Sequence, residues 1–460
     1  MQREEILSLL KEYGQHHILR HYHGLSAEKK RGFLRDLKGL DLKAVFDLHM
    51  KFSLESGIGR PFQDVCSAPI VTIPRAPAEI AAREEVRLLG ESLIRENQVA
   101  VLIVAGGQGS RLGFEGPKGK FPITPVQKKS LFQLFAEAVK AISLRYQGLL
   151  PLLIMASREN RQETTQFFES HRFFGLNGDA VYFFEQEMLP TLTPEGQLIL
   201  GDDTHLLVNP DGHGGSLKAL YKSGLLENLT QKGFTELFYC QVDNPLVKIA
   251  DPVFIGHHKR EGAEISTKVV RRRDPEEKVG IYGTVNGRPT IVEYSDFHPE
   301  EYRALDGQGN IRHWAGNIAV HMISLPFIQR LNVHGFALPY HRAVKKAEAL
   351  GPGGSKATIE SWKFESFVFD SIPLASKTCC LEVNREEEFS PVKNRQGKDS
   401  PDTARAAMNN LYRSWLAEAG AVLAPEARVE ISPLYALDKE ELIRKLQGKK
   451  LVIREDRYFE

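Results

Sequence analysis

The chain has 460 residues, with 60 Lys and Arg against 59 Asp and Glu, 42% hydrophobic residues and 26% charged residues. This length predicts roughly two to four domains, and the apolar fraction excludes a disordered chain. The formal net charge of +1 excludes a global basic field. We therefore expect neither nucleic acid nor a membrane as a partner.

The first residues and the cysteines indicate a cytoplasmic protein. Glu4, Glu5 and Lys11 interrupt the apolar pattern of the start, which predicts an amphipathic helix rather than a signal peptide. The longest apolar runs are far shorter than the ~20 residues that span a bilayer. No two cysteines form a C-x-x-C pair, which disfavours structural zinc and favours reduced thiols.

The predicted elements change in character after residue 96. Residues 1–60 show helical spacing of apolar side chains, 61–80 hold four prolines and read as a connector, and 77–96 predict a helix. Continuous apolar runs that suit buried strands then alternate with helical segments. The runs are 98–105, 149–156, 180–184, 237–242 and 264–270, and the helices between them include 130–143 and 215–229. This alternation predicts an α/β fold with a doubly wound sheet.

The later part of the chain predicts a hairpin and a small terminal region. Residues 279–291 alternate as in antiparallel strands, with Asn286-Gly287 as the turn. The GPGG segment at 351–354 is typical of a mobile loop, and 403–418 predict a helix within a tail of short strands.

A glycine-rich loop follows the first buried strand. It reads AGGQGSRLG over 105–113 and continues as PKGK over 117–120. No window satisfies the P-loop pattern. The dinucleotide fingerprint fails as well, because Leu112 replaces its third glycine and no acidic residue occurs in 117–130. These departures disfavour an NAD(P)-dependent oxidoreductase.

Two cations accompany this loop and suggest its chemistry. Glycine amides can cradle a phosphate, and Arg111 and Lys118 suit a departing pyrophosphate. The alternative is a turn with two solvated basic residues. The buried strand before the loop and the Pro-Lys step after it favour the functional interpretation.

The glycine loop and seven later segments, in chain order, carry a resemblance to a known family. The loop and its P-K-G sequence resemble the signature of eukaryotic-type UDP-sugar pyrophosphorylases, and three further segments resemble other parts of that family's site: FFEQEMLP at 183–190 its uracil-reading segment, NPDGHGG at 209–215 its second nucleotide loop, and QVDNPLVKIAD at 241–251 its metal-site strand end. Four more segments resemble the UDP-N-acetylhexosamine branch: VEYS at 292–295, NIA at 317–319, FVFD at 367–370 and EFSPVKN at 388–394.

The resemblance implies a fold and a domain division. We expect a mixed, mostly parallel doubly wound sheet of nucleotidyltransferase (GT-A-like) type, with a helical N-terminal piece and a small C-terminal domain. The expected boundaries are 1–92 for the helical region, 93–387 for the catalytic domain and 388–460 for the C-terminal domain.

The resemblance also implies the site residues. Catalytic roles fall on Arg111, Lys118 and Lys393, and the Mg2+ cofactor on Asp243 at a strand end. A carboxylate there can hold Mg2+ against phosphates, although an Asp that caps the next turn is the alternative. Nucleotide binding is expected at Gly106, Gly107, Gly109, Gln186, Gly212, His213 and Gly214, and sugar binding at Gly280, Glu293, Asn317, Phe367 and Phe369.

The predicted function is a Mg2+-dependent uridylyltransferase that converts UTP and N-acetylglucosamine 1-phosphate into UDP-N-acetylglucosamine and pyrophosphate. Two alternatives stay open. His213 stands where the hexosamine branch usually has Asn, which favours glucose 1-phosphate as the sugar substrate. The second alternative is an inactive sugar-nucleotide-binding protein.

Three other features receive structural interpretations. Asp251 precedes a proline and is expected to cap a turn. The Cys379-Cys380 pair is expected in the core. The histidine pairs at 16–17 and 257–258 are expected at the surface.

Overall fold

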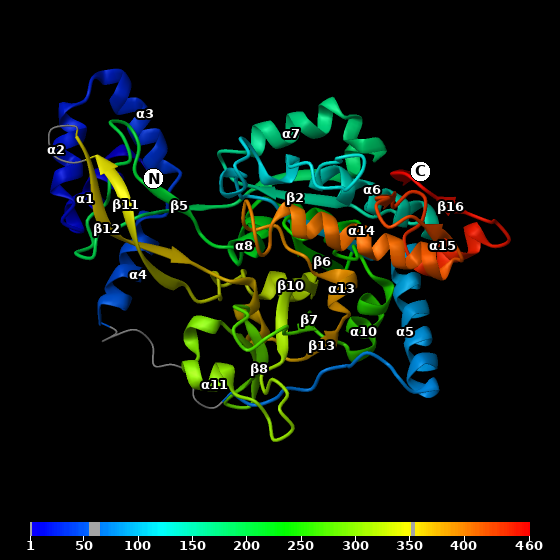
Figure 1. The fold of residues 1–460 in the computed structure, drawn as a ribbon. Coiled ribbons are helices and arrows are strands. Elements are labelled where there is room, and N and C mark those ends of the chain that lie inside the picture. Colours follow the sequence, from blue (N-terminus) through cyan, green and yellow to red (C-terminus); the bar gives the residue numbers. More distant parts are fainter. Residues whose placement is uncertain (1, 55–64, 351–354) are drawn as a thin grey trace. The chain divides into compact units, whose positions relative to one another are not determined.

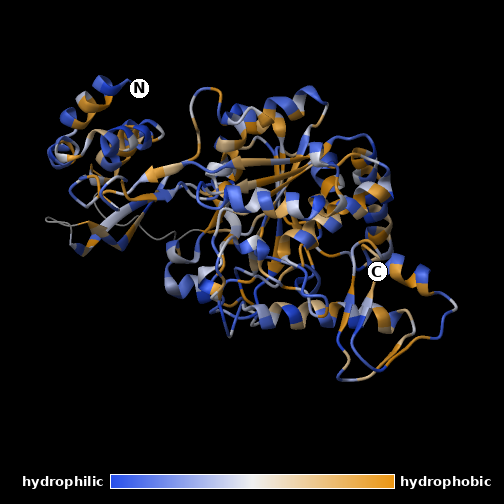
Figure 2. Cartoon of the chain, turned by 90° about the horizontal axis from the view of Figure 1, so that it is seen from above, coloured by the Kyte–Doolittle hydropathy of each residue, from blue (hydrophilic) through white to orange (hydrophobic). Residues whose placement is uncertain are grey.

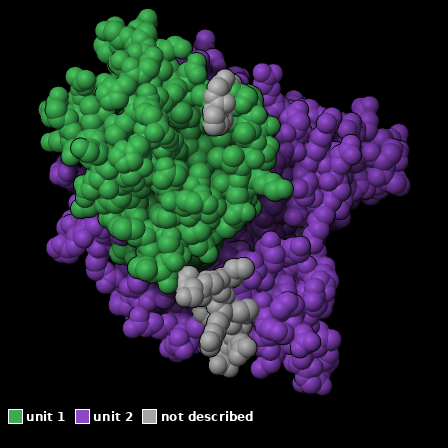
Figure 3. All heavy atoms as spheres, turned by 90° about the vertical axis from the view of Figure 1, so that its left-hand side faces the viewer, with its two compact units in different colours: residues 1–60, 186–219, 337–370 green, residues 61–185, 220–336, 371–460 purple. Residues whose placement is uncertain are grey.

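The computed structural model describes residues 2–54, 65–350 and 355–460 and divides the chain into two compact units, coloured separately in Figure 3. Unit 1 comprises residues 1–60, 186–219 and 337–370, and unit 2 comprises 61–185, 220–336 and 371–460. The predicted GPGG loop at 351–354 lies outside the described residues. The predicted boundaries near residues 92 and 387 rest on sequence alone and stay a prediction.

A nine-stranded sheet forms the centre of unit 2 in the described part of the chain (Figure 1). Its main path runs β13-β7-β10-β6-β1-β2-β3, and the β8-β9 hairpin pairs onto β10. The strands are β1 Val99–Val104, β2 Leu152–Ala156, β3 Val181–Glu185, β6 Glu236–Gln241, β7 Ile265–Arg271, β8 Ile281–Val285, β9 Arg288–Val292, β10 Ala315–Ser324 and β13 Thr378–Glu382.

Strands β6, β1, β2 and β3 run parallel, as do β7 and β13, whereas β10 is antiparallel to both β6 and β7. The predicted mixed, mostly parallel sheet is therefore confirmed. All side chains of β2 are buried, and Figure 2 shows the apolar character of these strands. Burial on both faces explains why they read as continuous apolar runs.

The helices of unit 2 contribute to the same core. Buried residues of α5, α6, α10 and α14 join those of β1, β2 and β6 in one apolar cluster. The helices are α5 Pro77–Arg95, α6 Leu131–Tyr146, α7 Arg161–Ser170, α9 Leu225–Gln231, α10 Pro252–Glu261, α11 Pro299–Arg303, α12 Leu325–Arg330, α13 Arg385–Glu388, α14 Pro401–Glu418 and α15 Lys439–Leu446.

The C-terminal part of unit 2 carries two small parallel pairs. Strands β14 Val422–Leu423 and β16 Val452–Ile453 form one pair, and β15 Val429–Ile431 and β17 Arg457–Phe459 form the other. Among the described residues, no helix combines the length and the apolarity that crossing a membrane requires.

Unit 1 brings the helical N-terminus together with two later stretches of the chain. Helices α1 Arg3–Glu12, α2 His16–Gly24, α3 Ala27–Lys38 and α4 Leu42–Leu54 share an apolar cluster with Leu189, Leu206 and Phe364. Strands β4 Met188–Pro190 and β5 Val208–Pro210 form one antiparallel pair, and β11 His341–Leu350 and β12 Lys356–Glu365 form another. The predicted helical N-terminus is confirmed.

Several local predictions can be compared with this fold. The five predicted strands and the hairpin are confirmed, with Asn286 at φ 51° and Gly287 at φ 74° in the turn, but β3 lies at the edge of the sheet and is only partly buried. The predicted helix over 215–229 is instead two helices, α8 Gly215–Lys222 and α9, because Gly224 adopts φ 75° between them. The β11-β12 hairpin was not predicted, since its strands carry mostly charged and small side chains.

The surface prediction for the second histidine pair was wrong. His257 and His258 lie in α10 and are only 4% and 1% exposed. His258 is hydrogen-bonded to Ser266 and to Glu236, which satisfies both ring nitrogens. The buried Cys379-Cys380 pair and the Asp251 side chain, which accepts from Val253 N–H at the start of α10, agree with expectation.

Candidate active site

The carboxyl ends of β1, β2 and β6 meet at one edge of the unit 2 sheet, because these strands are parallel neighbours. The glycine loop follows β1, the segment 157–160 follows β2, and Asp243 follows β6 closely. This edge is where open α/β sheets bind ligands.

The glycine loop is a compact turn closed by backbone hydrogen bonds. Gly109 N–H donates to the carbonyl of Gly116 at 2.9 Å, and Lys118 N–H donates to that of Gly107 at 3.1 Å. A Cβ at Gly109 would lie 2.7 Å from the Phe114 ring, so this glycine is needed for the turn itself. A Cβ at Gly107 would meet nothing within 4 Å, which leaves room above this residue for a ligand.

Asn160 anchors the glycine loop through side-chain hydrogen bonds. The sequence did not predict this role. The Asn160 side chain is fully buried, and its Nδ2 donates to the carbonyls of Ala105 at 3.1 Å and Gly107 at 3.4 Å. Its Oδ1 accepts from Ser157 N–H at 2.8 Å. A lone Asn after a strand carries no sequence signal for this role, because the contact joins residues 53 and 55 positions apart.

Asp243 and the predicted cations gather at this edge. Lys118 Nζ lies 3.8 Å from Asp243 Oδ2, and both side chains are 15% exposed. The backbone N–H of Val392 donates to the Asp243 carbonyl at 2.8 Å, which places the neighbouring Lys393 beside the same strand end.

The electrostatics favour an anionic ligand. Burial lowers the pKa of Lys118, Asp243 opposes this effect, and the nearby charges of Lys393 and Arg111 lower the pKa further. Lys118 is therefore repelled by two neighbouring cations and attracted by one carboxylate. An arriving phosphate would relieve their mutual repulsion, since charge-assisted hydrogen bonds to anions are strong where water is partly excluded.

The residues around Asp243 fit Mg2+ only in a substrate-bridged mode. No group of three or more His, Cys, Asp or Glu side chains able to hold a metal occurs in the described ranges. Mg2+ is commonly held by one or two carboxylates together with substrate phosphates. A single carboxylate with three cations nearby suits that mode and no dedicated protein cage.

A second predicted group also comes together in unit 2. Asn317 N–H donates to the Gly280 carbonyl at 2.8 Å, and a Cβ at Gly280 would lie 2.9 Å from Glu293 Oε1. Asn317 Oδ1 accepts from Ala319 N–H at 3.0 Å across a bulge in which Ala319 adopts φ 55°. Bulges of this kind re-aim side chains at the edge of a site. Amide and carboxylate groups can bind the hydroxyls of a sugar.

A third group forms in unit 1 from segments far apart in sequence. A Cβ at Gly212, where φ is +86°, would overlap the Ser366 carbonyl, and one at Gly214 would lie 2.7 Å from the Phe367 backbone. Gln186 Nε2 donates to the Gly212 carbonyl at 2.7 Å. The glycines are therefore required for the 212–214 loop to pack against residues 366–367, where the Gly212 carbonyl accepts the hydrogen bond from Gln186.

His213 and the two phenylalanines share one aromatic cluster. The ring centroid of His213 lies 5.2 Å from that of Phe367 and 5.7 Å from that of Phe369. The Nδ1 atom of His213 accepts a hydrogen bond from Val368 N–H at 3.2 Å. The structure thus places the residue predicted for nucleotide binding directly against those predicted for sugar binding.

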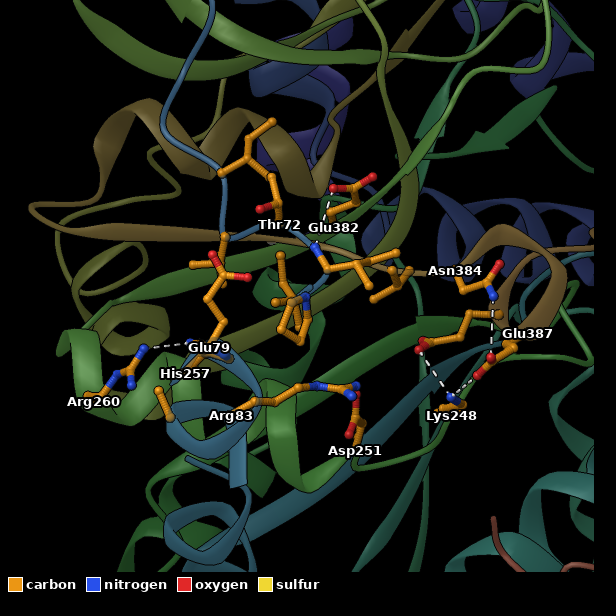
Figure 4. Close-up of a pocket in the computed structure, with 18 residues that line it drawn as sticks. Thr72, Glu79, Arg83, Lys248, Asp251, His257, Arg260, Glu382, Asn384 and Glu387 are labelled. Carbon is orange, nitrogen blue, oxygen red and sulfur yellow. Dashed lines mark hydrogen bonds and ion pairs between the residues drawn. The ribbon is translucent and has the colours of Figure 1, made fainter. Parts of the chain in front are cut away.

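A separate cavity of about 470 Å³ in unit 2 contains none of the predicted site residues. Figure 4 shows that α5, α10 and the end of β13 line it. Charged residues of its lining have structural partners: Lys248 lies 2.7 Å from Glu387, and Asp251 and Glu388 lie 2.7 Å and 2.6 Å from the fully buried Lys268. We assign the chemistry to the residues at the strand ends and not to this cavity. These residues, called the strand-end group below, are Arg111, Lys118, Asp243 and Lys393.

Comparison with known proteins finds a matching family and relatives that cover nearly the whole chain. The family model described as UTP--glucose-1-phosphate uridylyltransferase matches residues 73–445. The probable UDP-N-acetylglucosamine pyrophosphorylase of Dictyostelium discoideum is 33% identical over 98% of this chain and 97% of its own length. The UDP-N-acetylglucosamine pyrophosphorylase of Saccharomyces cerevisiae is 35% identical over 92% of each chain.

A solved structure agrees with these sequence relatives. The uridine diphosphate N-acetylglucosamine pyrophosphorylase of Trypanosoma brucei, crystallised with an inhibitor, matches with a TM-score of 0.82 at 26% identity. The match covers 99% of this chain and 98% of that one.

Proposed function

We propose, because this chain belongs to the UTP--glucose-1-phosphate uridylyltransferase family, that it transfers the uridylyl group of UTP to N-acetylglucosamine 1-phosphate. The chain is a UTP:sugar-1-phosphate uridylyltransferase, and the relatives from Dictyostelium discoideum and Saccharomyces cerevisiae are named for UDP-N-acetylglucosamine. The observation that carries the mechanism is the gathering of Arg111, Lys393 and Asp243 near Lys118 at the strand-end edge.

The reaction needs no covalent intermediate on the protein. An oxygen of the sugar phosphate attacks the α-phosphorus of UTP, the bond from that phosphorus to the bridging oxygen breaks, and pyrophosphate leaves. Catalysis of such a displacement consists of positioning and of charge neutralisation. The electrons of the broken bond go to the pyrophosphate oxygen, where a nearby cation stabilises the growing charge.

The strand-end group supplies these functions with its own residues. The turn amides of the glycine loop and the Arg111 guanidinium bind the triphosphate, and Lys118 binds the departing pyrophosphate. Lys393, held at the Asp243 strand end by the Val392 hydrogen bond, binds the attacking phosphate. Mg2+, when bound by Asp243 and the phosphates, would neutralise phosphate charge.

The uracil and the sugar are assigned to the other two groups. Gln186 and the 212–214 loop read the base, since an amide can match the edge of uracil. Gly280, Glu293 and Asn317 bind sugar hydroxyls, and Phe367 and Phe369 contact the acetyl methyl. A cytoplasmic location remains a prediction from the sequence.

The experiment that tests this proposal is a stoichiometric assay. UTP and N-acetylglucosamine 1-phosphate should give pyrophosphate and UDP-N-acetylglucosamine in equal amounts. Binding of UTP without turnover would support the inactive binding protein instead.

Glucose 1-phosphate is the second candidate substrate, because the His213 ring contacts Phe367 and Phe369, the two rings predicted to bind the sugar. Faster turnover with glucose 1-phosphate would reassign the sugar and would leave the uridylyl transfer intact.

A further inference from the structure

One buried carboxyl group in unit 1 has no part in the mechanism above. Asp211 is 0% exposed, its Oδ1 accepts from Gln186 Nε2 at 3.2 Å, and its Oδ2 has no hydrogen-bond partner. Buried polar atoms almost always have a partner, so an exception in a native site needs an explanation.

The surroundings fix this carboxyl group in place. Ser366 donates to the Asp211 carbonyl through both its N–H at 2.8 Å and its hydroxyl at 3.0 Å, and Asp211 N–H donates to the Glu187 carbonyl at 3.1 Å. A Cβ at Gly215 would overlap the carboxylate, so the group lies directly against the first residue of α8. The backbone of Asp211 is therefore held on both sides, and its carboxylate packs between Gly215 and the Gln186 amide.

The same contact fixes the amide of Gln186. Its Nε2 donates to two acceptors, Asp211 Oδ1 and the Gly212 carbonyl, and the residue is only 7% exposed. The Gly212 carbonyl can only accept, so the amide nitrogen must face this pair. The opposite atom, Oε1, is then directed away from them as a hydrogen-bond acceptor.

An acceptor with a fixed direction distinguishes the two pyrimidines. Uracil carries a hydrogen on N3 and can donate to Oε1, whereas N3 of cytosine is itself an acceptor. A site built to accept a hydrogen bond rejects an analogue that lacks the donor, because two acceptors then face one another.

We propose that Asp211 is the positioning residue that makes Gln186 select uracil over cytosine. This inference rests on the proposed base-reading role of Gln186. If Asp211 is removed, only the Gly212 carbonyl still orients the amide, and rotation of the amide presents Nε2 to N3 of cytosine.

The unpartnered oxygen agrees with this role. Burial raises the pKa of Asp211 to about 7, Lys218 opposes the effect and Glu187 adds to it. Tyr340 also interacts electrostatically with Asp211. When the group is protonated, the proton can reside on Oδ2 while Oδ1 still accepts from Gln186. The neutral isostere Asn can accept through Oδ1 in the same way.

The test compares Asp211→Leu, which keeps the branched shape without an acceptor, with Asp211→Asn. The quantity measured is the ratio of kcat/KM for UTP to that for CTP, at a saturating concentration of N-acetylglucosamine 1-phosphate. Asp211→Leu should lower this ratio by at least about tenfold, mainly through a higher KM for UTP. Asp211→Asn should keep the ratio within about threefold of the wild type. Thermal melting confirms that each variant is folded.

Two controls separate this inference from its premise. Asp36→Leu removes another buried Asp of unit 1, in α3, and should leave the ratio unchanged even if stability falls. Gln186→Leu should abolish the preference for UTP. If Gln186→Leu changes the ratio and folded Asp211→Leu does not, the positioning role is wrong. If Gln186→Leu leaves the ratio unchanged, the proposed base reading itself fails.

If Asp211→Leu does not fold, Asp211→Ser provides the test. The serine side chain is too short to place an acceptor where Oδ1 binds the Gln186 amide. An unchanged ratio in folded Asp211→Ser would overturn the proposal.

Discussion

The strand-end group of unit 2 and the 186–214 group of unit 1 are built in different ways. The first brings the charges of Arg111, Lys393 and Asp243 close to Lys118 and keeps open space beside Gly107. The second is held by close contact, with Gly212 and Gly214 against the backbone of 366–367. A mutation in the first group should therefore change charge and rate, whereas one in the second should change shape, stability and nucleotide affinity.

The largest effect is expected from loss of charge at the strand ends. Lys118→Ala should lower kcat by at least about 100-fold, because removal of one transition-state contact typically costs ~3 kcal/mol. Lys120→Ala is the matched control, since Lys120 pairs with Glu163 and is two residues away in the same turn. Comparable losses in both variants would show that the effect is structural.

Loss of shape in the unit 1 group should act differently. Gly212→Ala adds a Cβ that overlaps the Ser366 carbonyl at a residue with φ +86°. We expect a loss of about 1–3 kcal/mol in unfolding free energy and a higher KM for UTP. Gly24→Ala, where a Cβ meets nothing within 4 Å, should change stability by less than about 0.5 kcal/mol. Denaturant unfolding and UTP saturation curves provide the two measurements.

The metal dependence sharpens the account of the first group. Asp243→Asn keeps the shape and removes the charge that Mg2+ prefers. The Mg2+ concentration for half-maximal rate should rise by about tenfold, because the metal loses one charged oxygen ligand. An unchanged Mg2+ titration would mean that the metal is held without Asp243.

The smallest effect concerns pH and the second group. The pKa of Asp211 is raised from 3.8 to about 7, so the folded protein retains a proton that the unfolded chain releases. Stability should fall as pH rises through this window and should stay low above it. Asp211→Asn removes this loss, so its stability relative to the wild type should increase by about 1 kcal/mol or more between pH 5 and pH 8. A constant difference across that range would show that the carboxyl does not titrate there.

The sequence predicted the strand-end group better than its supporting contacts. Arg111 and Lys118 follow a buried strand within a few positions, so local pattern and the family resemblance both indicated them. Asn160 and Asp211 were missed as supporting residues. Asn160 makes contacts more than 50 positions away, and Asp211 reaches Gln186 across 25 positions. Such contacts depend on tertiary structure and leave no periodic signal.

The fold shows the same limit. The buried strands were found because burial on both faces gives continuous apolar runs. The β11-β12 hairpin and the break at Gly224 were missed, since charged strands and a single left-handed glycine produce weak patterns. His257 and His258 were placed wrongly because a polar residue type suggests exposure, whereas Ser266 and Glu236 supply buried partners to His258.

The central claim is tested most directly by comparing two sugars on one enzyme. With UTP and Mg2+, kcat/KM for N-acetylglucosamine 1-phosphate should exceed that for glucose 1-phosphate by a factor on the order of 10–200, the range that contacts with one small apolar group provide. The two substrates differ in the acetamido group that we assign to Phe367 and Phe369. A higher kcat/KM for glucose 1-phosphate, or no pyrophosphate release with either sugar, would contradict the account.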